Sequence, residues 1–102
     1  MKAKFLRLIG LARRAARVSL GADKTYESLK NKKAYAVFIA SDLSVKTEKE
    51  LNFKADGTNI KIIRTEYDIE TLSKAVGSPT GVIAIEDEGF AKALLGEIEG
   101  GK

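Results

Sequence analysis

The sequence predicts an α/β fold, a three-layer α/β/α sandwich built around a short, mixed four-stranded sheet. Stretches with apolar residues every three to four positions alternate with short apolar runs, in the order α-β-α-β-α-β-α-β-α. Two of these runs, 34–40 and 82–85, are apolar almost throughout, which is typical of strands buried on both faces. Helices must then cover both faces of the sheet. The length of 102 residues suits a single domain over 1–102.

The first third of the chain is predicted to hold two helices and one strand. Apolar residues three and four positions apart predict an amphipathic helix over 2–16. Its apolar face consists of Phe5, Leu8, Ile9, Ala12, Ala15 and Ala16. A short strand over 18–20 ends at Gly21, and a second helix over 22–32 begins directly after this glycine. The basic residues near position 32 suit a helix C-terminus.

The remaining elements are defined by capping residues and turn signals. They are a buried strand over 34–40, a helix over 45–55, a strand over 60–64, a helix over 69–76, a strand over 82–85 and a helix over 88–98, followed by a tail over 99–102 that we expect to be flexible. Ser44, Asp68 and Asp87 are the predicted N-caps of the three helices. Gly57, after Asp56, and Gly77 are predicted to end two of them.

Composition excludes several classes of function. The chain has no cysteine and no histidine, which excludes disulfides, thiolate or imidazole metal sites and Cys/His nucleophile pairs. Arg7 interrupts the N-terminal apolar run, so no signal-peptide core forms, and no run approaches the roughly 18 apolar residues of a membrane span. We therefore expect a cytoplasmic protein.

The charge is distributed unevenly. The net charge is +4, but residues 1–33 carry ten Lys/Arg against two acidic residues and residues 34–102 carry eight against twelve. Such polarity is typical of proteins that bind a polyanion. A solvated basic helix without a partner is the alternative interpretation.

The motifs of common enzymes do not occur. Gly21 stands alone, without the further glycines of a dinucleotide or phosphate-binding loop. Ser19, Ser41 and Ser44 have no histidine to activate them. The acidic stretches "EYDIE" and "EDE" are interpreted as helix starts, where acidic residues favour the helix dipole. We expect no catalysis, no cofactor and no metal, and an enzyme is the least favoured hypothesis.

The residues favour nucleic acid, and RNA in particular, as the partner. The N-terminus of the helix after Gly21 offers free backbone N–H groups and a partial positive charge to phosphate. Lys24 lies in its first turn, and Lys30 and the arginines of the first helix would contact phosphates without reading sequence. The seven aromatic residues lie at core-like spacings, with no base-stacking motif. A turn without a ligand remains the alternative for the glycine.

Four stretches resemble a known family in their order and spacing. They are "LIGLARRAARVSLG", "SLKNKKAYAVFIASD", "LSKAVGSPTGVIAI" and "DEGFAKALL". The chain resembles the kink-turn-binding ribosomal-protein superfamily of the L-seven-Ae type, and within it the bacterial YlxQ-like branch. The resemblance covers about residues 5–98 and implies an α/β/α sandwich that binds RNA.

The resemblance also implies two RNA-binding segments. In the family, a glycine is followed by an Asn-Glu pair and then by a Lys, which recognise the sheared G·A pairs of a kink-turn. By position, Gly21 matches the glycine, Asp23 the Asn, Lys24 the Glu and Glu27 the Lys, so all three recognition residues differ. The second segment is a loop that packs on a flipped-out nucleotide, and residues 76–81 match it.

The leading hypothesis is a non-catalytic, ribosome-associated or ribosomal-protein-like protein that binds structured RNA, such as ribosomal or riboswitch-like RNA, without a membrane partner. The ribosome is a further expected partner. The predicted RNA-binding residues are Gly21, Ala22, Asp23, Lys24, Glu27, Lys30, Arg14, Arg17, Val76, Ser78, Pro79 and Thr80. The alternative is a protein–protein adaptor that kept the family fold and lost the RNA site.

Overall fold

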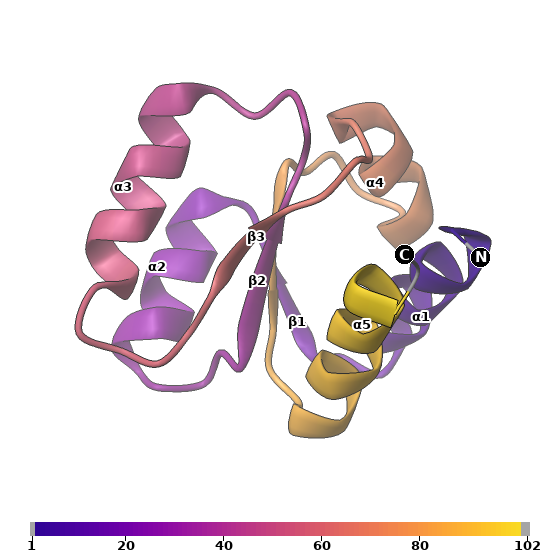
Figure 1. Cartoon of the computed structure of the whole chain (residues 1–102), viewed down its shortest axis with the longest axis horizontal. Coiled ribbons are helices and arrows are strands. Elements are labelled where there is room, and N and C mark those ends of the chain that lie inside the picture. Colours follow the sequence, from indigo (N-terminus) through magenta and orange to yellow (C-terminus); the bar gives the residue numbers. More distant parts are fainter. Residues whose placement is uncertain (1, 101–102) are drawn as a thin grey trace.

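A computed structural model describes the backbone of residues 2–100 and the side chains of residues 4–99 (Figure 1). Helices and strands alternate throughout these residues. The elements are α1 (Lys2–Arg14), β1 (Val18–Leu20), α2 (Ala22–Lys30), β2 (Ala36–Ile39), α3 (Val45–Ala55), β3 (Ile62–Arg64), α4 (Ile69–Val76), β4 (Val82–Ile85) and α5 (Glu88–Gly100). The predicted order of elements is confirmed.

The four strands form one mixed sheet in the order β1-β4-β2-β3. The strand β4 runs antiparallel to both neighbours and pairs Ala84 with Ser19 of β1 and with Val37 of β2. The edge strand β3 is parallel to β2. Because β4 is antiparallel to β1, the residue that follows β1 lies beside the start of β4.

The strands β2 and β4 are buried on both faces, as predicted. Alternate residues point to opposite sides, so Phe38 and Ile83 join a core formed with α1, α4 and α5, whereas Ile39 and Ala84 join a second core formed with α2 and α3. In the first core the Phe5 ring meets the edge of Phe38, with 5.3 Å between ring centroids. Figure 1 shows the two helical layers on either side of the sheet, which confirms the three-layer sandwich.

The three predicted N-caps are confirmed. The Ser44 hydroxyl accepts a hydrogen bond from the Thr47 amide at 3.2 Å. The Asp68 carboxylate accepts one from the Thr71 amide at 2.8 Å, and the Asp87 carboxylate accepts one from the Phe90 amide at 3.2 Å. Each bond satisfies a backbone donor that has no partner inside its helix. At the other end of α4, Gly77 adopts φ +81°, the left-handed conformation that ends a helix.

Several predicted ends of elements are corrected by the structure. The helix α1 ends at Arg14 rather than at 16, because Ala16 adopts φ +60° in the turn toward β1. Ala15 and Ala16 are exposed and do not belong to the buried face. Likewise, α2 ends at Lys30, because Lys32 adopts φ +59°.

The remaining differences concern strand lengths, the C-terminal tail and two aromatic residues. The strands β2 and β3 are shorter than predicted and span 36–39 and 62–64. The helix α5 continues through 99–100, where a flexible tail was expected, and residues 101–102 lie outside the described chain. Tyr35 and Phe53 are exposed, contrary to the prediction from spacing that the aromatic residues lie in the core. None of the helices described over 2–100 is long and apolar enough to cross a membrane.

Candidate nucleic-acid interface

The junction between β1 and α2 is formed by a glycine in a conformation that other residues avoid. Gly21 adopts φ +92° and ψ 161°. A Cβ atom at this position would meet nothing within 4 Å, so the conformation rather than a lack of space calls for glycine. The Gly21 carbonyl accepts the Thr25 amide at 3.1 Å. The amides of Ala22 to Lys24 are therefore the free donors of the first turn, and no side chain caps this end.

The exposed side of α2 carries charges of both signs. Thr25, Ser28 and Leu29 are buried against the sheet and α3. The exposed residues are Asp23, Lys24, Glu27 and Lys30. Among the described side chains, these four take part in none of the observed salt bridges. Asp23 and Glu27 are one turn apart and face the same side, so the positive end of the helix is partly neutralised.

The loop 76–81 meets the start of α2 through one backbone carbonyl. The Val82 carbonyl accepts the Gly21 amide at 2.9 Å and the Thr80 hydroxyl at 2.7 Å. The Thr80 amide in turn donates to the Ser73 hydroxyl of α4 at 2.9 Å. The two segments that the sequence predicts to bind RNA are therefore joined at one end of the sheet.

The side chains of this loop differ in accessibility. Val76 is buried in the core with α1 and α5, and Thr80 is buried beneath the loop. Pro79 is exposed and Ser78 is half-buried. The structure therefore leaves Ser78 and Pro79 at the surface, whereas the side chains of Val76 and Thr80 hold the loop in place.

The two arginines predicted to contact RNA occupy different parts of the molecule. A Cβ atom added to Gly10 would lie 3.8 Å from Arg14 Nη1 and 3.0 Å from the Ala75 carbonyl oxygen. Arg14 is thus beside the last turn of α4, which leads into the loop 76–81. Arg17 precedes β1 and accepts the Glu86 amide through its carbonyl at 2.7 Å. Arg17 precedes Gly21 by four residues, and at roughly 3.3 Å per residue of extended strand the two are about 13 Å apart.

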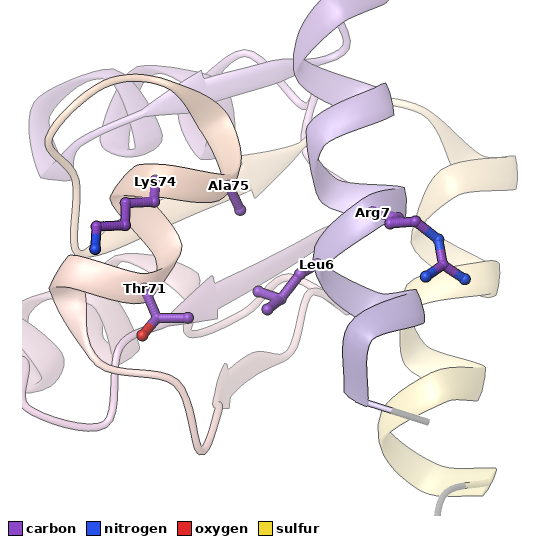
Figure 2. Close-up of a pocket in the computed structure, with 5 residues that line it drawn as sticks. All are labelled: Leu6, Arg7, Thr71, Lys74 and Ala75. Carbon is purple, nitrogen blue, oxygen red and sulfur yellow. The ribbon is translucent and has the colours of Figure 1, made fainter.

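Two surface grooves were not anticipated from the sequence. One lies between α1 and α4 and is lined by Leu6, Arg7, Thr71, Lys74 and Ala75 (Figure 2). Leu6 points from α1 toward α4, whereas Arg7 points to the other side of α1. The second groove lies between α2 and α3 and contains the exposed Phe53. The sequence signal for this second groove was the phenylalanine within the lysine-rich helix 45–55.

The chain is an α/β/α sandwich with a mixed sheet. The N-terminus of α2 and the loop 76–81 are joined at one end of this sheet. Residues 3–95 match the ribosomal protein L7Ae/L30e/S12e/Gadd45 family. The chain belongs to this family, which confirms the resemblance seen in the four sequence stretches.

Two curated relatives are similar over almost the whole chain. The RNA-binding protein YlxQ of Enterococcus faecium is 35% identical over 97 residues, covering 95% of this chain and 93% of the relative. The RNA-binding protein YlxQ of Bacillus subtilis (strain 168) is 30% identical over 89 residues, covering 86% of this chain and 88% of the relative. This agrees with the bacterial branch to which the sequence was assigned.

Solved structures share the fold. A protein of unknown function from Bacillus halodurans C superposes with a TM-score of 0.89 at 30% identity, covering 95% of this chain and 98% of that one. The Giardia lamblia 15.5kD RNA binding protein superposes with a TM-score of 0.76 at 19% identity, covering 97% and 88%. At that identity the second likeness concerns the fold alone.

Proposed function

We propose that this protein is a non-catalytic RNA-binding protein of the cytoplasm whose interface is the start of α2 together with the loop 76–81. The observation that carries this proposal is the Val82 carbonyl, which joins the two segments by accepting both Gly21 and Thr80. The two YlxQ relatives are named RNA-binding proteins, which supports RNA as the ligand. Association with the ribosome is part of the same proposal.

The chemistry of the site suits a phosphate backbone that approaches the end of a helix. The free amides of Ala22 to Lys24 offer hydrogen bonds, and the helix dipole adds a partial positive charge. Lys24 and Lys30 are exposed on the same helix and would add charge without reading sequence. Regular A-form RNA has a deep, narrow major groove that side chains do not read. We therefore propose a kink-turn or a similarly distorted RNA as the ligand.

The remaining site residues divide by their accessibility. Ser78 and Pro79, which are accessible, would contact the RNA, and Arg14, beside α4, would extend the basic surface. We propose that Val76 and Thr80 act indirectly, by fixing the shape of the loop from the buried side. Arg17 lies farther from this surface.

The proposal is tested by measuring affinity for a kinked and a straight RNA duplex over a range of salt concentrations. We expect tighter binding to the kinked duplex and a steep loss of affinity with salt, because phosphate contacts release counterions. Arg14→Ala should lower the log–log salt slope by about one. Arg17→Ala is the matched control and should change the slope less. Its separation from Gly21, about 13 Å, exceeds the Debye length of about 8 Å at physiological salt.

Other results would contradict the proposal. Absence of binding to both duplexes would remove RNA as the ligand, and salt-insensitive binding would remove the phosphate contacts. In either case a protein–protein adaptor becomes the better description of the fold. Equal affinity for both duplexes would overturn the preference for distorted RNA alone.

A further inference from the structure

The groove between α2 and α3 has an aromatic ring at its open side. It is lined by Tyr26, Glu27, Leu29, Lys30, Phe53 and Lys54. Leu51 and Ala55 fix the orientation of α3 by packing into the core. Phe53 projects from the other side of the helix and is 80% exposed, the largest exposed fraction among the exposed large apolar side chains of the described residues.

The wall of this groove is held by polar contacts. The Tyr26 hydroxyl donates to the Glu50 carboxylate at 3.1 Å, and Lys54 Nζ lies 5.1 Å from the centroid of the Tyr26 ring. Partial burial raises the pKa of Tyr26, and the neighbouring Glu50 raises it further. The hydroxyl therefore stays protonated and continues to donate. These contacts connect α2 to α3 and leave the Phe53 ring free.

The charges around this ring leave a small excess of lysine, because Glu48 is paired with Arg64. Lys46, Lys49 and Lys54 lie on α3 with Phe53, and Lys30 faces the groove from α2. The acidic residues of the groove, of α3 and of its C-cap are Glu27, Glu48, Glu50 and Asp56. Glu48 pairs with Arg64, and the Glu50 carboxylate accepts the Tyr26 hydroxyl. None of the four lysines takes part in the salt bridges seen among the described side chains.

We propose that Phe53 is a stacking platform for an unpaired base of the RNA, with Lys30 and Lys54 contacting the adjoining backbone. This inference rests on the proposed function and extends it to a second contact surface. Aromatic faces flanked by cationic side chains bind single-stranded nucleic acid with little sequence preference. A protein partner fits less well, because the cores of protein interfaces are depleted of lysine.

The helix α2 connects this platform to the proposed interface at its N-terminus. Lys24 and Lys30 are six residues apart, about 9 Å along the helix axis. Figure 1 shows α2 and α3 side by side in the same layer. An unpaired strand that leaves a kinked duplex at Gly21 would therefore reach Phe53 by following α2, passing on the α3 side of Glu27.

The test compares one kinked duplex with the same duplex carrying a short unpaired tail on either strand. The tail contains 2-aminopurine, whose fluorescence is quenched by stacking. We expect the tail to increase the affinity of the unmodified protein about five-fold to about a hundred-fold, the range that one stacked base provides. Phe53→Ala should abolish both this gain and the quenching, and Phe53→Trp should retain them. Val45→Ala changes another exposed apolar residue of α3 and is the matched control.

The outcomes separate the inference from the proposed function. If the unmodified protein binds the duplex but gains nothing from the tail, or if Phe53→Ala retains the gain, the platform is disproved and the proposed function stands. If the unmodified protein binds no RNA, both fail. A dimer that sedimentation detects in the unmodified protein and not in Phe53→Ala would assign the ring to a second copy of this chain and overturn the inference.

Discussion

Glu27 places a negative charge one helical turn after Asp23, on the exposed side of α2. If this side faces phosphates, both carboxylates repel the RNA and Lys24 compensates for one of them. We predict that Glu27→Lys strengthens binding to a kinked duplex several-fold at low salt, about 1 kcal/mol. Gel-shift titration measures the change. Glu88→Lys on α5, in the opposite helical layer, is the control because it alters the net charge equally. The same gain from both variants would indicate non-specific attraction.

Single residues also show the limits of sequence reasoning about the site. The family pattern assigned both the segment at Gly21 and the loop 76–81 to RNA binding, and the structure joins the two through the Val82 carbonyl. The pattern did not reveal that Thr80 is buried, because the direction of its side chain depends on bonds between the loop, α4 and β4. The aromatic residues lie at core-like spacings, yet Phe53 is exposed, because helical spacing alone does not identify which of two neighbouring faces packs.

The helix caps provide a prediction about stability and pH. Hydrogen bonds from Thr71 lower the pKa of Asp68 below its ordinary value of 3.8. Because the folded-state pKa is lowered, the stabilisation is present above 3.8 and is lost as the pH falls through the folded-state pKa. Asp68→Ala should therefore reduce the thermal midpoint at neutral pH, and the difference from the unmodified protein should shrink in acid.

Ser44→Ala removes the equivalent cap of α3 and is the matched control. It should cost about 1 kcal/mol of unfolding free energy at neutral and acidic pH alike, because serine does not titrate. Thermal melting followed by circular dichroism measures both variants. A cost of Asp68→Ala that stays constant down to strongly acidic pH would show that the carboxylate charge does not contribute to the cap.

The two helices with signals at both ends in the sequence were predicted to the residue, whereas α5, with only its N-cap Asp87, runs beyond the predicted end. The helices at 45–55 and 69–76 and the strand at 82–85 have the bounds that the sequence indicated. The ends of α1 and α2 were missed, because Ala16 and Lys32 adopt positive φ without being glycine. Both turns are closed by local hydrogen bonds of the Schellman type, from the Arg17 amide to the Ala12 carbonyl and from the Lys33 amide to the Ser28 carbonyl, each at 2.9 Å. The sequence carries no sign of these ends, because the left-handed residue is neither glycine nor asparagine.

The fold divides the basic N-terminal third between two layers. The residues of α1 lie on one side of the sheet and those of α2 on the other (Figure 1). A basic stretch that is continuous in sequence is therefore not one continuous surface. Under the proposed function, Arg14 beside the last turn of α4 and Lys24 at the start of α2 would contact the RNA from opposite layers, at the end of the sheet where α4 leads into the loop 76–81. This arrangement explains why Arg14 and Arg17, three residues apart, are expected to differ in their effect on RNA binding.

The two cores share the strands β2 and β4, and we predict that they unfold as one unit. Ile83 and Ile39 are fully buried on opposite faces of the sheet. Ile83→Val should cost about 0.5–1.5 kcal/mol and accelerate exchange of the most protected amides in α3 as much as in α5, although Ile83 does not face α3. Ile39→Val, on the other face, is the matched variant and should give the same result. Faster exchange confined to the mutated side, measured by NMR under native conditions, would show that the layers open independently.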